Sequence, residues 1–202
     1  MPATIVVVRH PEKDGDKITP HGAEQAFAAA LALGERFKNF EGFDRLIHSG
    51  AHRAWQALRV MAAALGLKLP DEERSFLNFT ATLTQTLGSS DAFYAEVAKM
   101  KAAEGTDRLT LAMALRHSEF ARQGRQIMIN GLLGLACDMA MRGQATALTV
   151  SHSPWLELAS FDTENTPYGI GESDAVIYVV AGDEILVGSE LVRAPLPGKP
   201  LF

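Results

Sequence analysis

The sequence is poor in cysteine and contains no long uninterrupted apolar run. Its single cysteine, Cys137, can form no disulfide within the chain and excludes a zinc site built from several cysteines. No stretch approaches the roughly 18 consecutive apolar residues that suggest a membrane-spanning helix, so no membrane partner is expected. A basic leader followed by an apolar segment is also missing, and we therefore expect a cytoplasmic protein.

The chain also lacks an excess of positive charge. It has 19 Lys and Arg against 24 Asp and Glu, which gives a net charge of −5. A mildly acidic chain does not favour nucleic acid as a partner, although it can still contain a small basic pocket. The length of 202 residues, with no internal repeat and no linker, predicts a single domain over residues 1–202.

Short apolar runs rich in β-branched residues predict strands. The candidate strands are residues 5–8, 45–48, 145–150, 175–180 and 184–191. The continuous apolar character of the first and third is typical of strands buried on both faces of a parallel sheet. Gly182 and Asp183 lie between the last two candidates and predict an antiparallel hairpin near the C-terminus.

Helical spacing of apolar residues lies between these strands. The candidate helices are residues 20–37, 54–65, 91–103 and 109–142. Thr19 before Pro20 is a typical start, because Thr caps a helix and Pro is favoured at its first position. We expect the glycines at 124, 131 and 134 to break or bend the last helix. Strands that alternate with helices predict an α/β layer fold with a mostly parallel sheet.

Histidine and arginine follow three of the candidate strands. Arg9 and His10 follow the first strand, His48 ends the strand 45–48 and Arg53 comes after it, and His152 follows the strand 145–150. In an open α/β sheet, ligands bind beyond the carboxyl ends of the strands. If these strands are parallel neighbours, the side chains converge into a site for a tetrahedral oxyanion. Arginine binds phosphate through two N–H groups, and a neutral histidine can act as a nucleophile or as an acid or base.

Four motifs, in this order, resemble those of the histidine phosphatase superfamily, which is also called phosphoglycerate-mutase-like. They are RHPEK (9–13), ITPHGAEQA (18–26), SGAHRAWQ (49–56) and VSHSP (150–154). The resemblance implies a three-layer αβα sandwich with a mostly parallel central sheet. Within the superfamily, the chain is similar to the small phosphohistidine phosphatases of branch 1.

The resemblance also implies an activity, a metal-independent phosphatase that requires no cofactor. His10 would be the nucleophile and would form a phosphohistidine, while Arg9, Arg53 and His152 would bind the phosphoryl group. Thr19 is a weaker candidate for the lining of the same pocket. We expect a phosphate ion to bind there, and we expect a phosphorylated small molecule or a phosphoprotein as the substrate, either as a phosphomonoester or as a phosphoramidate.

The general acid of the family has no clear match in this chain. One branch carries Asp directly after the late histidine, where this chain has Ser153. The other branch carries Glu in the segment after the second helix, where residues 77–80 contain no acidic side chain. The candidates for the acid are Asp71, Glu73, Asp91 and Glu12.

Three other functions stay open at this point. The unmatched acid allows a non-catalytic phosphate-binding module, and the superfamily also contains phosphoglycerate-type mutases. A metal-dependent hydrolase could use His10, His48 or His52, and His152, although two arginines in the same pocket would repel a cation. In each case we expect residues 69–107 to form a variable cap over the pocket that sets specificity.

Overall fold

The computed structural model describes residues 2–37, 42–182 and 184–192, which form a six-stranded sheet with helices on both faces. The strands of this sheet are β1 (Ala3–Arg9), β4 (Arg45–His48), β5 (Asp71–Glu73), β6 (Thr146–Ser151), β7 (Ala175–Ala181) and β8 (Glu184–Val192). The helices are α1 (Pro20–Arg36), α2 (His52–Ala64), η1 (Ser75–Leu77), α3 (Phe79–Thr86), α4 (Ser90–Glu104), α5 (Leu111–His117) and α6 (Glu119–Met141). A small separate hairpin joins β2 (Lys13–Asp14) to β3 (Lys17–Ile18).

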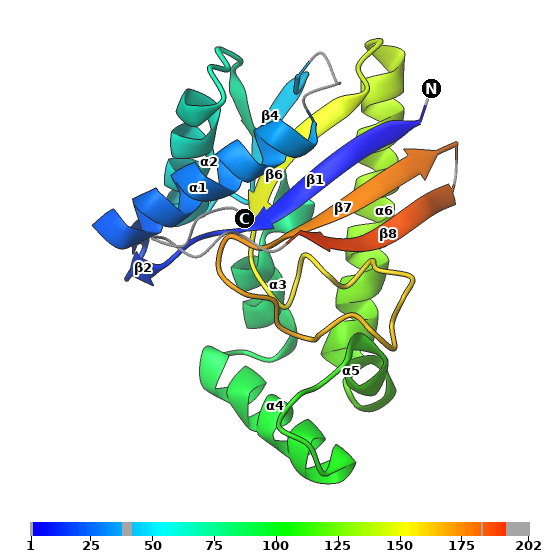
Figure 1. Cartoon of the computed structure of the whole chain (residues 1–202). Coiled ribbons are helices and arrows are strands. Elements are labelled where there is room, and N and C mark those ends of the chain that lie inside the picture. The colour runs from blue at the N-terminus through cyan, green and yellow to red at the C-terminus, as the bar shows by residue number, and fades with distance from the viewer. Residues whose placement is uncertain (1, 38–41, 183, 193–202) are drawn as a thin grey trace.

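The sheet has the order β5-β4-β6-β1-β7-β8 (Figure 1). The pairs β5–β4, β4–β6 and β6–β1 are parallel, whereas β7 is antiparallel to both β1 and β8. The predicted α/β fold, with a mostly parallel sheet and an antiparallel hairpin near the C-terminus, is therefore confirmed. Gly182 in the hairpin loop has a φ of 62°, which glycine adopts without steric cost, and Asp183 lies outside the described residues.

The continuous apolar sequence of β1 reflects burial on both faces of the sheet. Successive side chains of a strand point to opposite faces. Ile5 and Val7 pack into the cluster that contains α6 and the helices α3 to α5, and Val6 and Val8 pack into the cluster formed with α1 and α2. Figure 1 shows α1 and α2 on one side of the sheet and α6 on the other. The predicted three-layer αβα arrangement follows from this double burial.

The start of α1 holds the first loop in place. Thr19 caps the helix, because its hydroxyl oxygen accepts a hydrogen bond of 2.9 Å from the N–H of Gly22, and Pro20 takes the first helical position as predicted. The carbonyl of Glu12 accepts the N–H of Thr19, and a Cβ on Gly22 would lie 2.1 Å from that same carbonyl oxygen. Glycine is therefore required at residue 22 for the loop to fold back onto α1.

The sequence predicted one helical region over residues 109–142 that glycines break or bend, and the predicted position of the break is wrong. The chain breaks at Ser118, between α5 and α6, and the Ser118 hydroxyl caps α6 by accepting the N–H of Ala121 at 3.0 Å. The three glycines lie inside α6. A Cβ on Gly131 would lie 2.2 Å from the ring of Phe76, and one on Gly124 would lie 2.6 Å from the ring of Trp155. These two glycines allow neighbouring aromatic rings to pack against the helix backbone.

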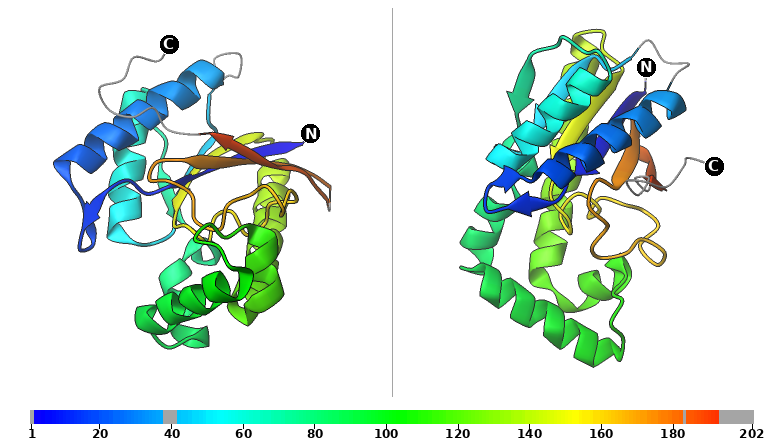
Figure 2. Two further views of the ribbon diagram at one scale, coloured as in Figure 1. Left: turned by 60° about the horizontal axis from the view of Figure 1, so that its bottom comes forward. Right: turned by 60° about the vertical axis from the view of Figure 1, so that its left-hand side comes forward.

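Residues 69–90 are more regular than the sequence suggests. They contain the edge strand β5, which pairs in parallel with β4, followed by η1 and α3. The strand escaped prediction because its three residues are all acidic, and its position at the edge of the sheet depends on pairing rather than on an apolar pattern. Figure 2 shows α3, α4 and α5 together at one end of the sheet. No helix in the described ranges is long and apolar enough to cross a membrane.

The contact between Gly131 and Phe76 predicts a position-specific effect on stability. Gly131→Ala forces the new methyl group into the Phe76 ring, and overpacking of this kind lowers the free energy of unfolding by about 1–3 kcal/mol. Gly134→Ala lies three residues further along α6, and its new methyl group has no neighbour within 4 Å. This substitution should raise the free energy of unfolding by about 0.5–1 kcal/mol, because alanine has the higher helix propensity. Urea unfolding of both variants measures the difference. Equal effects would show that Phe76 does not pack against α6 in this way.

Candidate active site

The carboxyl ends of β1, β4 and β6 meet at one edge of the sheet. Arg9, the last residue of β1, pairs with Ser151, the last residue of β6. The N–H of His10 then donates to the carbonyl of Ser151 at 3.0 Å, and the N–H of Ser49 donates to the carbonyl of Val150 at 3.2 Å. The segments that follow the three strands therefore start from adjacent points, as the sequence predicted for neighbouring parallel strands.

Two histidine side chains lie in contact at this edge. The rings of His10 and His152 are 5.0 Å apart between centroids in an edge-on arrangement, and the two residues are only 6% and 2% exposed. Nδ1 of His10 lies 2.8 Å from the carbonyl oxygen of Pro11. A carbonyl can only accept, so Nδ1 carries the proton. Nε2 of His10 is consequently the nitrogen with a free lone pair.

His152 is held by two side chains from the β4–α2 segment. Its Nε2 lies 2.9 Å from the hydroxyl oxygen of Ser49, and its Nδ1 lies 3.3 Å from Nη2 of Arg53. A guanidinium can only donate, so Nδ1 accepts from Arg53 while the Nε2–H donates to Ser49. The hydroxyl of Ser49 can also reverse its role, because a serine both donates and accepts.

Both histidines are neutral at ordinary pH. Burial lowers the pKa of His10 to about 4, against an opposing hydrogen bond to Pro11, and the positive charges of Arg53, Arg9 and Lys13 lower it further. Burial is also the main reason that the pKa of His152 lies well below its usual 6.5. An unprotonated imidazole is the form that can act as a nucleophile.

Two arginines bring positive charge to the same edge. Nη1 of Arg9 donates to the carbonyl oxygen of Ile170, and Nη1 of Arg53 donates to Asp16 at 2.7 Å. The Nε–H groups of both arginines are buried and have no hydrogen-bond partner within the described part of the chain. α2 begins beside them at His52 without a side-chain cap, and the positive end of a helix favours an anion. The arrangement is suited to an oxyanion that accepts the unpaired N–H groups.

Thr19 and Glu12 form the base of the first loop instead of joining the histidines. The Thr19 hydroxyl donates to Oε1 of Glu12 at 2.7 Å while it accepts the N–H of Gly22. Both hydrogen-bonding roles of that hydroxyl are therefore taken by the helix cap and the loop. The backbone N–H of Glu12 donates to the side-chain oxygen of Gln25, which ties the loop to α1 a second time.

The remaining acid candidates lie at different distances from the site. Asp71 on β5 accepts from Nε1 of Trp55 at 2.9 Å, and Asp91 is exposed in the first turn of α4. Glu73 ends β5 beside Gly50, where a Cβ would lie 2.4 Å from Oε1 of Glu73. Across the described residues, none of the candidates forms a hydrogen bond to His10 or His152. Glu73 nonetheless lies beside Gly50, the residue that follows Ser49 in the chain.

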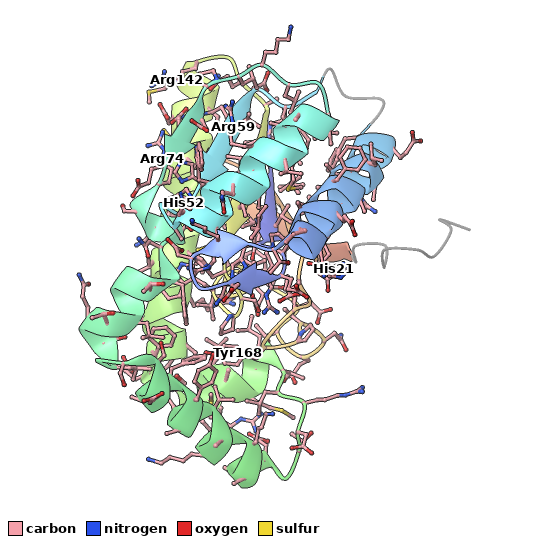
Figure 3. The ribbon with its side chains drawn as sticks, turned by 90° about the vertical axis from the view of Figure 1, so that its left-hand side faces the viewer. His21, His52, Arg59, Arg74, Arg142 and Tyr168 are labelled. Carbon is pink, nitrogen blue, oxygen red and sulfur yellow. The ribbon has the colours of Figure 1, made fainter. Side chains whose placement is uncertain are left out.

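His48, at the end of β4, and His52, at the start of α2, have other partners. Nδ1 of His48 accepts the N–H of Gly50 at 3.1 Å, and the ring of His52 stacks on Trp55 with 5.4 Å between centroids. Figure 3 shows His52 and Arg59 along α2. Among residues 2–37, 42–182 and 184–192, no three His, Cys, Asp or Glu side chains lie close enough together to hold a metal ion.

Glu157 is a site residue that the sequence reasoning missed. Its Oε1 accepts hydrogen bonds of 2.8 Å from the Ser153 hydroxyl and from the N–H of Gly169. The Ser153 oxygen in turn accepts the N–H of Ile170 at 2.8 Å, and the carbonyl of Ile170 holds Arg9. The buried carboxyl group thus orders the loop that positions an arginine of the site.

The side chain of Glu157 is fully buried. Burial raises the pKa of its carboxyl to about 7, although its hydrogen bonds and the charge of Arg9 act in the opposite direction. The signal in the sequence was a lone charge in the run PWLELA (154–159), which follows directly after the late histidine motif. Asp16 and Ser49 were missed as partners of Arg53 and His152, because loop residues carry no periodic pattern.

The neutral state of the two buried histidines can be measured directly. Imidazole resonances in two-dimensional NMR spectra, assigned with His10→Gln and His152→Gln variants, should show His10 and His152 uncharged from pH 8 down to pH 5. The physical reason is burial beside Arg9 and Arg53. Protonation of either ring near pH 6.5 would contradict the enclosed, positively charged site.

The raised pKa of Glu157 predicts a pH-dependent stability difference. A carboxyl whose pKa is higher in the folded than in the unfolded state stabilises the fold below its unfolded pKa, and this stability is lost as the pH rises through about 7. Glu157→Gln removes the titration. The free energy of unfolding of the variant relative to wild type should therefore increase by about 2 kcal/mol between pH 5 and pH 8.

The matched control is Glu164→Gln, the same substitution at an exposed position of the same segment. Its free energy of unfolding relative to wild type should vary little over the same pH range. If the two variants behave alike, Glu157 is not buried in the folded protein.

The fold is similar to several solved structures at low sequence identity. Phosphoglycerate mutase from Bacillus anthracis str. Sterne is 16% identical, with a TM-score of 0.67 and 92% of this chain and 91% of that chain covered. The protein histidine phosphatase SixA complexed with tungstate is 15% identical, with a TM-score of 0.55 and coverages of 95% and 97%. The alpha-ribazole phosphatase from Shigella flexneri is 15% identical, with a TM-score of 0.55 and coverages of 98% and 100%.

No protein-family model and no curated protein sequence matches the chain. The likeness is therefore one of structure, and it extends over nearly the full length of both chains in each comparison. Together with the strand order, it shows that this chain has a phosphoglycerate-mutase-like fold.

Proposed function

We propose that this protein is a metal-independent phosphatase that hydrolyses a phosphomonoester or a phosphoramidate through a phosphohistidine on His10. The observation that supports this most strongly is the neutral His10, with Nε2 free, beside Arg9 and Arg53, whose Nε–H groups are buried and unpaired. A tetrahedral oxyanion would satisfy those donors. The complex of histidine phosphatase SixA with tungstate, which is such an oxyanion, is in line with this proposal.

In the first step, Nε2 of His10 attacks phosphorus. The N–P bond forms while the bond from phosphorus to the leaving group breaks, and the leaving oxygen or nitrogen takes the bonding electron pair. The Nδ1–H of His10 keeps its hydrogen bond to Pro11, which stabilises the positive charge that the ring gains. Arg9 and Arg53 stabilise the negative charge on the phosphoryl oxygens, and two guanidinium groups can do this without a metal ion.

His152 can serve as a further donor to the phosphoryl group if Ser49 reverses its hydrogen bond. In the structure, the Nε2–H of His152 donates to Ser49 and the Nδ1 accepts from Arg53. If the Ser49 hydroxyl donates to Nε2 instead, the proton of His152 moves to Nδ1. The Nδ1–H and the Nη2–H of Arg53 can then both donate to the phosphoryl oxygens. Ser49 is thus a positioning residue for His152.

In the second step, a water molecule attacks the phosphohistidine. The O–P bond forms, the N–P bond breaks, and Nε2 of His10 recovers its lone pair, so inorganic phosphate leaves and neutral His10 is restored. A poor leaving group must also be protonated as it departs in the first step, and this requires a proton donor. Two carboxyl groups lie next to site residues. Asp16 accepts a hydrogen bond from Arg53, and Glu73 lies beside Gly50. An activated aryl phosphate needs no such donor, so it tests the nucleophile separately.

We further propose that residues 1–202 act as one domain and that residues 69–107, which contain α3 and α4, cover the site and set its specificity. A non-catalytic phosphate-binding module is the second candidate, because none of the four predicted acids bonds to the histidines within the described residues. Such a module would bind an oxyanion without turnover.

The test of the nucleophile is hydrolysis of p-nitrophenyl phosphate with and without EDTA. Wild type should be active in both conditions, and His10→Ala should lower kcat by about 1000-fold or more, because no phosphoenzyme can form. Retained activity in the variant would refute the role of His10. A wild type that binds vanadate but turns over no substrate would favour the module instead.

Oxyanion binding by Arg53 can be tested with a matched arginine on the same helix. Arg53→Ala should weaken vanadate binding by about 10- to 100-fold, the effect of losing charge-assisted hydrogen bonds in a partly buried site. Arg59→Ala removes a side chain that is 57% exposed and should bind vanadate as wild type does. Isothermal titration of both variants measures the difference. Equal affinities would place the anion away from Arg53.

A further inference from the structure

A cavity of about 250 Å³ opens beside Arg9, on the side of the strand ends where α3 and α4 lie. Ser153 and Pro154, which directly follow His152, form part of its wall. The cavity therefore borders the group of histidines and arginines described above through Arg9, which lines it. A ligand whose phosphoryl group contacts Arg9 would direct the rest of its structure into this space.

The walls of the cavity are mostly apolar and aromatic. They include Phe79 and Leu83 on α3, and Phe93, Tyr94 and Val97 on α4. Phe79 also touches the site itself, because its ring centroid is 6.3 Å from that of His152. It occupies the segment in which the family motif would have placed an acid. Walls of this kind favour an apolar, flat group and exclude a highly hydrated one.

Tyr168 also lines the cavity, and Figure 3 shows it near α4. Its hydroxyl is buried, so the aromatic ring is the part of this side chain that a ligand can contact. The polar side chains of the lining are those of Arg9, Ser90, Tyr94 and Ser153.

We infer that this cavity binds the leaving group of the substrate, and that the leaving group contains an aromatic ring. This inference rests on the proposed phosphatase function, since it assumes that the phosphoryl group contacts Arg9. It names the substrate class as an aromatic phosphomonoester. Sugar phosphates and phosphoglycerates, whose hydroxyl and carboxylate groups would lie against Phe79, Phe93 and Val97, are disfavoured.

The test compares benzyl phosphate with ethyl phosphate. Both have primary alkyl leaving groups of similar reactivity, so the difference between them is the ring. Wild type should hydrolyse benzyl phosphate with a kcat/KM about 30-fold higher, the effect of burying one aromatic ring in an apolar cavity. Similar values for the two substrates would overturn the inference.

Two variants on neighbouring positions of α4 show whether the cavity causes this preference. Val97→Asp puts a charge into the wall and should reduce the benzyl-to-ethyl ratio about tenfold. Ala98→Asp puts the same charge on the exposed side of the helix and should leave the ratio as in wild type. An unchanged ratio in Val97→Asp would overturn the inference, whatever its overall activity.

A phosphotyrosine peptide in the same panel distinguishes a protein source of the ring from a small molecule.

The outcomes also separate this inference from the proposed function. If wild type hydrolyses no phosphomonoester and binds no vanadate, the proposed phosphatase itself fails. If ethyl and benzyl phosphates are hydrolysed equally through His10, the phosphatase stands and only the aromatic leaving group is wrong.

Discussion

The parallel pairing of β1 with β6 is the interaction on which the site depends. It aligns Arg9 with Ser151 and continues into the hydrogen bond from the N–H of His10 to the carbonyl of Ser151. Because side chains alternate between faces, a slip of one residue would turn Val6 and Val8 away from α1 and α2 and would separate the two histidines. The hydrophobic cores on both faces of the sheet therefore specify the register, and the register brings His10 to His152.

Burial at this edge has opposite effects on acidic and basic groups, and the site uses both. It keeps His10 neutral, and the nearby arginines act in the same direction. It also raises the pKa of the Glu157 carboxyl, which orders the loop that holds Arg9. A chain with a net charge of −5 thus concentrates Arg9, Arg53 and Lys13 where an anion would bind. The acidic composition concerns the whole chain, whereas anion binding depends on this local group.

The features that could be predicted have local causes. The strands were visible as β-branched runs, the cap at Thr19 as a Thr-Pro pair, and the histidine and arginine positions as residues that follow strands. The missed features depend on contacts between distant segments: β5 exists through its pairing with β4, and Glu157 acts through the loop around Gly169. The glycines of α6 were misread because the partner ring of Phe76 comes from a segment far away in the sequence.

Arg9 joins the two halves of the proposed binding site. One of its terminal nitrogens is bound to Ile170, and that loop depends in turn on Ser153 and Glu157. The guanidinium is therefore held in place before any ligand arrives, and its Nε–H is left without a partner among the described residues. The same side chain borders the cavity lined by α3 and α4. If the phosphoryl group binds at Arg9 as proposed, the substrate atoms that extend into the cavity contact those helices, and the residues of α3 and α4 would then influence which phosphoryl compounds reach His10.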